Sequence, residues 1–454
     1  MLKVITTSTL EWPTFQKAYA TTANTTSNPP RRRAGKSLMD LPPELRMQIY
    51  EKLLSHPRCQ NTQILRVCRT IYWEARSALF KRGIDFESQS DLYAWLQRVD
   101  QGHLSYVTGL GIRLQDVSGD DLFASLSDRI QQAKMTTSSS KHKQPSLYSR
   151  EIERLRPTLA LFYNVKEFKI YKPRSNEIPP DSEMYEGVLH KINNLFPKLE
   201  RLSLYIDKIP MSSVARIRTL KSLCFTGFSV ASPEELAAAL QRIPHFEAIE
   251  LHGPPTRLGC SQRHSHRRKK VVQTMTPSVL KAIPPLKSYT IFEDKDSDRD
   301  GPVFLNSKLW RTLRDYHGSL KTLRIQTDVS MASEGRSAFR DLLRSSSLRE
   351  LAVCWSSHED GVKDVGALPK SLRVLELSIS HREKEARKVA EALISRRKDL
   401  RRLSELTLKV NWARCGPSKH LAVESSMAAI IPHLREAGFR ASWTYWVPGR
   451  IVQC

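Results

Sequence analysis

The sequence predicts an α/β protein in which a short amino-terminal helical module precedes a solenoid of parallel strands joined by helical crossovers. Two observations carry this prediction. Apolar residues recur with the spacing LxxLxL along most of the chain, and two short amphipathic segments come before the first complete series of these repeats. A single copy fits a buried strand of an ordinary α/β fold, whereas ten successive copies favour a solenoid.

Length and composition limit the classes of protein to consider. The 454 residues suffice for one large domain or two ordinary ones. No apolar run approaches the roughly 20 residues that a membrane-spanning helix needs, so we expect no membrane association. The seven cysteines are scattered and form no CxxC pair. They indicate reduced thiols, and hence a cytoplasmic or nuclear protein.

Residues 1–36 form a segment rich in threonine and serine that carries six basic residues and one acidic residue. Such a composition is typical of a disordered basic arm. It is also compatible with an organelle transit peptide, which remains an alternative.

The first amphipathic segment begins at two prolines that a first helical turn tolerates, Pro42 and Pro43. Leu45, Ile49 and Leu53 then repeat every four residues, so they share one face of the predicted helix. Arg46 lies off this face, and we expect its side chain to be in solvent.

The second amphipathic segment repeats apolar residues at helical spacing and ends before Gly83, a plausible helix stop. The repeated positions are Ile64, Cys68, Ile71, Ala75 and Leu79. Together the two segments define a helical module over residues 37–83, which is too small to hold a stable core alone.

These segments resemble the F-box, in particular the compact form common in filamentous fungi. The resemblance rests on the run LPPEL at 41–45, on Ile49 and Leu53, and on Val67-Cys68-Arg69. It implies docking on the Skp adaptor, and through it on the cullin, of a cullin–RING ubiquitin ligase. The residues that match the family's docking pattern are Leu41, Pro42, Leu45, Ile49, Leu53, Leu65, Val67, Cys68 and Ile71. The alternative is that the hairpin only caps the downstream domain.

Ten LxxLxL copies follow, with leading positions spaced 21 to 58 residues apart. They resemble an irregular leucine-rich-repeat domain, which we place at residues 84–422, with a basic insertion at about 254–274. Residues 423–454 are expected to cap the open end. The leading positions are Val107, Val165, Leu199, Leu220, Phe246, Leu286, Leu320, Leu348, Leu372 and Leu403.

The concave face of such a solenoid presents three positions of each repeat: those on either side of the middle apolar residue and the one after the last. These thirty positions carry five basic and five acidic residues, and this balance argues against a nucleic acid in the groove. They also include Tyr171, Tyr205, His252 and Phe292, whose large side chains suit recognition of a protein substrate. The alternative is that these side chains simply cover the sheet.

The net charge of +25 keeps a second function open. The loop 263–270 is strongly basic. The residue directly after the leading apolar position is also basic in several repeats. We call this set the basic rim; it includes Lys166, Lys221, Lys287, Lys321, Arg349 and Arg373. The alternative to a ligase subunit is therefore a repeat scaffold outside the ubiquitin system, located in the nucleus and binding nucleic acid through this loop and rim.

Known catalytic and ligand-binding motifs are incomplete. The run 34–37 resembles the end of a phosphate-binding loop, but Pro30 stands where its first glycine belongs. Residues 296–301 begin like a calcium loop, yet position twelve is Ser307. Cys260, His264 and His266 offer three ligands where a closed zinc site needs four. We expect no enzymatic activity, no cofactor and no metal site.

Overall fold

The computed structural model describes residues 37–55, 67–81, 83–115, 127, 148–171, 182–206, 209, 211–253, 272–293, 304–327, 331–354, 361–379, 383–411, 420–447 and 450–453. All structural statements below concern these residues. Residues 1–36, Ile64, Leu65, Cys260, the basic run 263–270 and residues 296–301 lie outside them.

A single 13-stranded sheet organises the chain. Twelve of its strands are parallel and follow one another in chain order, while β15 (Arg450–Gln453) pairs antiparallel with the last of them. The parallel strands are β1 (Ile84–Phe86), β2 (Gly109–Arg113), β3 (Glu167–Tyr171), β4 (Arg201–Leu204), β5 (Ser222–Phe225), β7 (Ala248–His252), β9 (Ser288–Glu293), β10 (Thr322–Thr327), β11 (Glu350–Cys354), β12 (Val374–Ile379), β13 (Glu405–Asn411) and β14 (Arg440–Val447).

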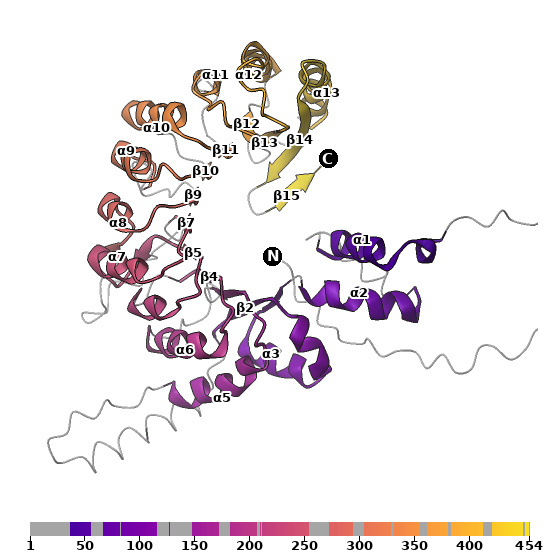
Figure 1. The fold of residues 1–454 in the computed structure, drawn as a ribbon, viewed down its shortest axis with the longest axis vertical. Coiled ribbons are helices and arrows are strands. Elements are labelled where there is room, and N and C mark those ends of the chain that lie inside the picture. Colours follow the sequence, from indigo (N-terminus) through magenta and orange to yellow (C-terminus); the bar gives the residue numbers. More distant parts are fainter. Residues whose placement is uncertain are drawn as a thin grey trace, which may run out of the picture.

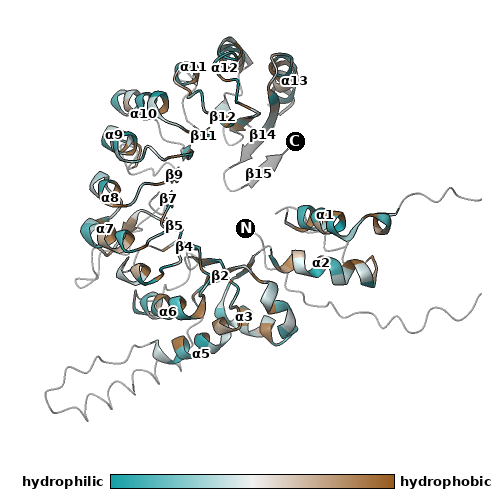
Figure 2. Cartoon of the chain, viewed as in Figure 1, coloured by the Kyte–Doolittle hydropathy of each residue, from teal (hydrophilic) through white to brown (hydrophobic). Residues whose placement is uncertain are grey.

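The strands line the inner side of a C-shaped arc and the crossover helices form its outer layer (Figure 1). Colouring by hydropathy shows brown and teal patches on these helices, as expected where one face packs on the sheet (Figure 2). The helices after β1 are α3 (Gln89–Leu96), η3 (Gln101–Tyr106), α5 (Ser149–Ala160), α6 (Ser182–Leu195), η4 (Met211–Arg216), α7 (Pro233–Gln241), α8 (Pro277–Ala282), α9 (Ser307–Tyr316), α10 (Ser333–Ser345), α11 (Gly361–Val365), α12 (Glu383–Ser395) and α13 (His420–Glu436).

The ten LxxLxL copies coincide with ten consecutive strands of the sheet, from β2 to β13. Their apolar positions stack in register, as Leu323 does between Tyr289 and Leu351. All thirty of these side chains are at most 7% exposed. The predicted α/β solenoid of parallel strands with helical crossovers is therefore confirmed, and its core lies between sheet and helices.

A ladder of backbone hydrogen bonds ties the repeats together where the strands begin. The carbonyl oxygen of Lys166 accepts from the N–H groups of Glu200 and Arg201, each at 2.8 Å. The carbonyl of Glu200 does the same for Lys221 and Ser222 of the next repeat, and the pattern runs from Thr108 to Arg373. The main chain makes this connection, so it does not depend on a particular side chain in any repeat.

Local sequence signals explain where the crossover helices begin. The side chain of Ser232 accepts from the N–H of Glu235, and the carboxylate of Glu235 accepts from the N–H of Ser232. This reciprocal pair is a capping box, and Pro233 occupies the first helical position of α7. At α9 the side chain of Asn306 accepts from the N–H of Leu309 at 3.0 Å, which is a simple N-cap.

Strands β1 and β14 extend the sheet beyond the ten predicted repeats. At the carboxyl-terminal end, α13 leads through Gly438, at φ +85°, into β14. A separate two-stranded antiparallel sheet is formed by β6 (Phe228–Ser229) and β8 (Val272–Gln273). Within the described residues, no helix is both long and apolar enough to cross a bilayer.

The amino-terminal module is a pair of helices, α1 (Pro43–Ser55) and α2 (Arg69–Lys81), preceded by the short turn η1 (Leu38–Asp40). Its buried residues are Tyr50, Leu54, Ile71, Ala75 and Ala78, and they form a cluster separate from the solenoid core. Gly83 follows α2 at φ +70°, which only glycine adopts easily, so its role as a stop signal is confirmed.

One expectation about this module is wrong. Arg46 is 8% exposed rather than in solvent. Its guanidinium donates to both carboxylate oxygens of Glu74, at 2.9 and 2.5 Å, and to the carbonyl oxygens of Met39 and Leu41. Helical spacing marks Arg46 as polar, but it does not reveal that Glu74 on the other helix is its partner.

Contacts at the end of α2 join the module to the solenoid. The ring of Phe80 lies 5.2 Å from that of His103 in η3 and 6.3 Å from that of Trp95 in α3. The hydroxyl of Thr108 donates to the carbonyl of Lys81 at 3.0 Å. The module is thus attached at the amino-terminal end of the arc, apart from the outer helix layer (Figure 1).

Candidate functional site

The four groove residues singled out in the sequence form one continuous row of rings. Tyr171 and Tyr205 stack with a centroid distance of 5.3 Å and an interplanar angle of 3°. Tyr205 meets His252 edge-on at 5.0 Å, and His252 stacks on Phe292 at 4.7 Å. Each of the four is partly exposed. We call this set the aromatic row; it spans the inner face from β3 to β9.

Tyr171 is fixed by a contact that crosses a neighbouring strand. Its hydroxyl donates to the carboxylate of Asp85 on β1 at 3.0 Å. The contact passes over Gly111 on β2, where a Cβ would stand 2.1 Å from Asp85 Oδ1 and 2.7 Å from Tyr171 Cε2. Burial and the nearby Asp85 charge raise the pKa of Tyr171, which keeps the phenol protonated as a donor.

Beside the aromatic row lies a cluster of three potential ligands: Cys224, Glu250 and His252. Cys224 and Glu250 are paired across β5 and β7, and His252 follows two residues after Glu250. The Sγ atom, a carboxylate oxygen and an imidazole nitrogen all lie within 4.8 Å of one another. His252 Nε2 is 2.7 Å from Glu250 Oε1.

This cluster is not predicted by any ligand motif, because its members are separated in the chain and match no known ligand spacing. The repeat register contains the missing signal. Cys224 and Glu250 both follow the middle apolar residue of adjacent repeats, so parallel pairing must place them side by side on the inner face. The sequence pattern places His252 on the same face but gives no sign that it contacts Glu250.

The charges of the inner face are largely neutralised by one another. The Nζ atom of Lys169 lies 3.2 Å from a carboxylate oxygen of Glu167 on the same strand. The guanidinium of Arg324 lies 3.6 Å from the carboxylate of Glu350 on the neighbouring strand. Lys409 forms an ion pair with Glu376. These pairs neutralise three of the five basic residues of the inner face, which reduces the charge available to attract a phosphate backbone.

The basic rim is partly neutralised too. Lys221 pairs with Glu200 at 3.0 Å, and Lys287 pairs with Glu247. Lys321 donates instead to the hydroxyl of Ser347 at 2.7 Å. The rim therefore presents less free positive charge than the sequence alone suggests.

The helical module exposes several of the residues that match the F-box pattern. Leu45 is 46% exposed, Leu53 43% and Val67 67%. Pro42 and Cys68 are also exposed, whereas Leu41 and Ile49 are half-buried. Ile71 is buried in the core of the module, where it supports the hairpin. Leu65 lies outside the described residues.

Further apolar surface on this module was not singled out in the sequence as a docking feature. Trp73 on α2 is 58% exposed, with the guanidinium of Arg76 3.9 Å from its ring centroid. Met39 in η1 is 36% exposed. The module therefore combines a closed core of its own with large apolar side chains in solvent.

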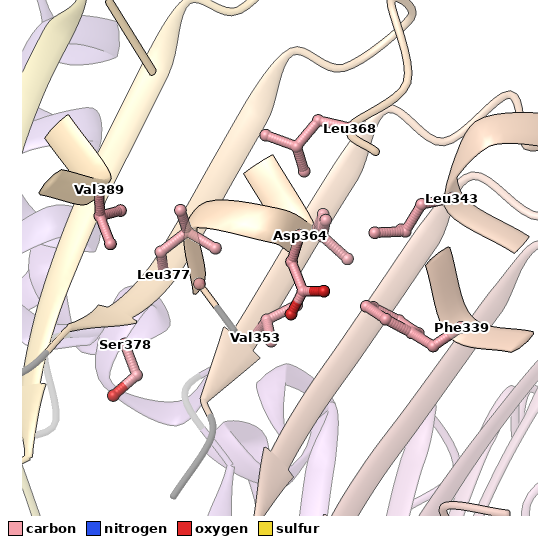
Figure 3. A pocket seen from close by; sticks show the side chains of 10 residues that line it. Phe339, Leu343, Val353, Asp364, Leu368, Leu377, Ser378 and Val389 are labelled. Carbon is pink, nitrogen blue, oxygen red and sulfur yellow. The ribbon is translucent and has the colours of Figure 1, made fainter. Parts of the chain in front are cut away.

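A small pocket elsewhere in the solenoid contains a buried acid. Asp364 of α11 lies among apolar side chains that include Phe339, Leu377 and Val389 (Figure 3). Its Oδ1 is buried without a hydrogen-bond partner among the described residues, and burial raises the pKa of this carboxyl to about 6. The pocket has room for about one water molecule, too little for an organic ligand.

Comparisons with known proteins add little to this geometry. No family model matches the chain, and no curated protein matches it. One similar solved structure is the TLR13–ssRNA13 complex, with a TM-score of 0.28 and 13% sequence identity over 73% of this chain. The match spans only 42% of that chain. The solenoid assignment rests on the strand order and register described above.

Proposed function

We propose that the protein is a non-catalytic substrate receptor of a cullin–RING ubiquitin ligase. In this proposal the α1–α2 module docks on a Skp adaptor, and the inner face of the solenoid holds a protein target. The observation that carries it is the exposed apolar surface of the module, in particular Leu45, Leu53 and Val67.

A helical pair that served only to cap the solenoid would turn its apolar side chains toward it. Here α1 and α2 enclose a core of their own, and the Arg46–Glu74 pair joins them. The exposed leucines are therefore not needed for that core. Large exposed apolar side chains gathered on one small module are typical of an interaction surface.

The arrangement also suits a protein that binds two partners at once. The module projects from the amino-terminal end of the arc, whereas the aromatic row lies on the inner strands (Figure 1). Rigid aromatic side chains contribute large contact areas at protein interfaces. The two proposed binding surfaces therefore lie on different elements, the α1–α2 pair and the inner strands.

The adaptor half of the proposal is tested by capture of a purified Skp adaptor on the immobilised full chain. Leu45→Asp together with Leu53→Asp places two charges on exposed positions and should abolish capture. The matched control is Leu161→Asp together with Tyr163→Asp, because these side chains are 38% and 51% exposed on the solenoid. The control should capture the adaptor as the wild type does.

Circular dichroism of each variant verifies that the fold is retained. Failure of the folded wild-type chain to capture the adaptor would remove the ligase proposal. So would equal capture by both double variants, since the docking surface would then lie elsewhere. Affinity capture from cells, followed by mass spectrometry, would identify adaptor and target together.

A further inference from the structure

We propose that Cys224, Glu250 and His252 form a binding site for a transition-metal ion, with Zn²⁺ as the expected occupant. The site lies on the inner face of the solenoid, at the centre of the aromatic row. The inference does not depend on adaptor docking, because it rests on the donor set and its geometry alone.

The donors already converge without a metal. Tetrahedral zinc at bond lengths of 2.0 to 2.3 Å requires its ligand atoms to be roughly 3.3 to 3.8 Å apart. The three donors here lie within 4.8 Å of one another, and the Glu250–His252 contact is 2.7 Å. Side-chain rotations that move each atom by about an ångström would complete the geometry.

The backbone and the neighbouring rings hold the donors in place. Cys224 and Glu250 project from directly paired positions of adjacent strands, β5 and β7. The imidazole of His252 stands between the edge of Tyr205 and the face of Phe292. Rigid elements and packed rings of this kind favour a pre-organised site.

The surroundings leave room for a fourth ligand. Cys224 is 5% exposed, but the side chains of His252 and Glu250 are 30% and 38% exposed toward the groove. Three protein ligands with one open position are the arrangement in which zinc binds water or a side chain of a partner. A metal here would therefore also be accessible to a bound protein.

The donor types select the metal. Thiolate and imidazole together suit zinc, whereas calcium and magnesium prefer oxygen ligands alone. Binding exchanges the thiol proton of Cys224 for the metal, and that proton leaves to solvent.

Titration of the metal-free, reduced full-length protein with Co²⁺ tests the inference, because cobalt bound to thiolate gives a near-ultraviolet charge-transfer band. We expect one equivalent of Co²⁺ to produce the band and Zn²⁺ to displace it. Cys224→Ser should abolish the band. His252→Gln and Glu250→Gln, at partly exposed positions, should weaken binding at least tenfold without disturbing the fold.

Two controls distinguish this site from other sources of binding. Cys354→Ser removes a thiol of similar burial, 6% exposed, and should leave the band unchanged. A triple variant of Cys260, His264 and His266 removes the ligands of the basic insertion and should also leave it unchanged. The inference is overturned if no band forms, if it survives Cys224→Ser, or if it is lost in the triple variant.

Discussion

Arg46 and Glu74 join the two helices of the amino-terminal module through a pair of side-chain hydrogen bonds, at 2.9 and 2.5 Å. The hydroxyl of Tyr50 donates to the same carboxylate at 3.2 Å. Two-point contacts between guanidinium and carboxylate fix orientation as well as distance. The pair therefore sets the angle at which α1 presents its exposed leucines.

We expect Arg46→Ala to loosen the module and to leave the solenoid intact, because the two cores share no buried residue. Backbone amides of α1 and α2 should exchange with deuterium faster, while those of β10 keep the wild-type rate. Lys52→Ala, at an exposed position of the same helix, is the control. Equal acceleration throughout the chain would contradict the independence of the two cores.

The same pair predicts an acid dependence of the module. The hydrogen bond from Arg46 lowers the pKa of Glu74, so its stabilising effect is fully present above the unfolded value of about 4.3. The effect is lost as the pH falls through the folded value. Backbone amides of α1 and α2 should therefore exchange faster in Glu74→Gln than in the wild type at pH 7. This difference in exchange rate should shrink below about pH 4.

Gly111→Ala should destabilise the solenoid and displace one end of the aromatic row. The added methyl group would collide with Asp85 and Tyr171, and overpacking of this kind costs about 1–3 kcal/mol. Gly318→Ala is the matched control, because a Cβ there meets nothing within 4 Å. Urea unfolding measures both, and similar losses of unfolding free energy would refute a specific role of Gly111.

Asp364 should make the solenoid less stable as the pH rises from about 4 to 6. Its folded-state pKa, about 6, lies above the unfolded value of about 3.9, so the folded state binds more protons in this window. Asp364→Asn removes this pH-dependent loss of stability, because an amide does not titrate. Its unfolding free energy, relative to the wild type, should rise by about 2–3 kcal/mol between pH 4 and pH 7.

Ser378→Ala serves as the control for this measurement, since Ser378 lines the same pocket without titrating (Figure 3). Its unfolding free energy relative to the wild type should not vary between pH 4 and pH 7. A pH-independent difference for Asp364→Asn as well would show that burial does not perturb the carboxyl.

Tyr205→Ala together with Phe292→Ala should reduce capture of the target protein and leave capture of the Skp adaptor unchanged. These rings lie on the inner face of the solenoid, whereas the proposed adaptor surface lies on α1 and α2. Quantitative mass spectrometry of captured proteins measures both partners in one experiment. Unchanged recovery of every captured protein would remove the aromatic row as the target site.

The sequence predicts the solenoid well because its signal is repeated. Each LxxLxL copy is weak alone, but stacked strands must align them, as Leu323 aligns with Tyr289 and Leu351. The same register placed Tyr171 and Phe292 on the inner face. Strand β1 was not predicted, because its three residues contain no complete LxxLxL repeat.

Pairwise contacts between distant residues are what the sequence does not reveal. Helical periodicity assigns Arg46 to a polar position, but its burial depends on Glu74, 28 residues away. The Tyr171–Asp85 hydrogen bond spans 86 residues and requires the absence of a side chain at Gly111. Likewise, Cys224 and Glu250 become a potential metal site only once β5 pairs with β7.

The main-chain hydrogen bonds from Thr108 to Arg373 hold the arc together, whereas side chains on its inner face form the proposed binding surface. Because carbonyl and amide groups make these bonds, substitutions at the rim can accumulate without loosening neighbouring turns. Crossovers can also lengthen or shorten, as the unequal repeat spacing of 21 to 58 residues illustrates. Exposed loops and rim side chains can therefore change without breaking the hydrogen bonds that hold neighbouring repeats together.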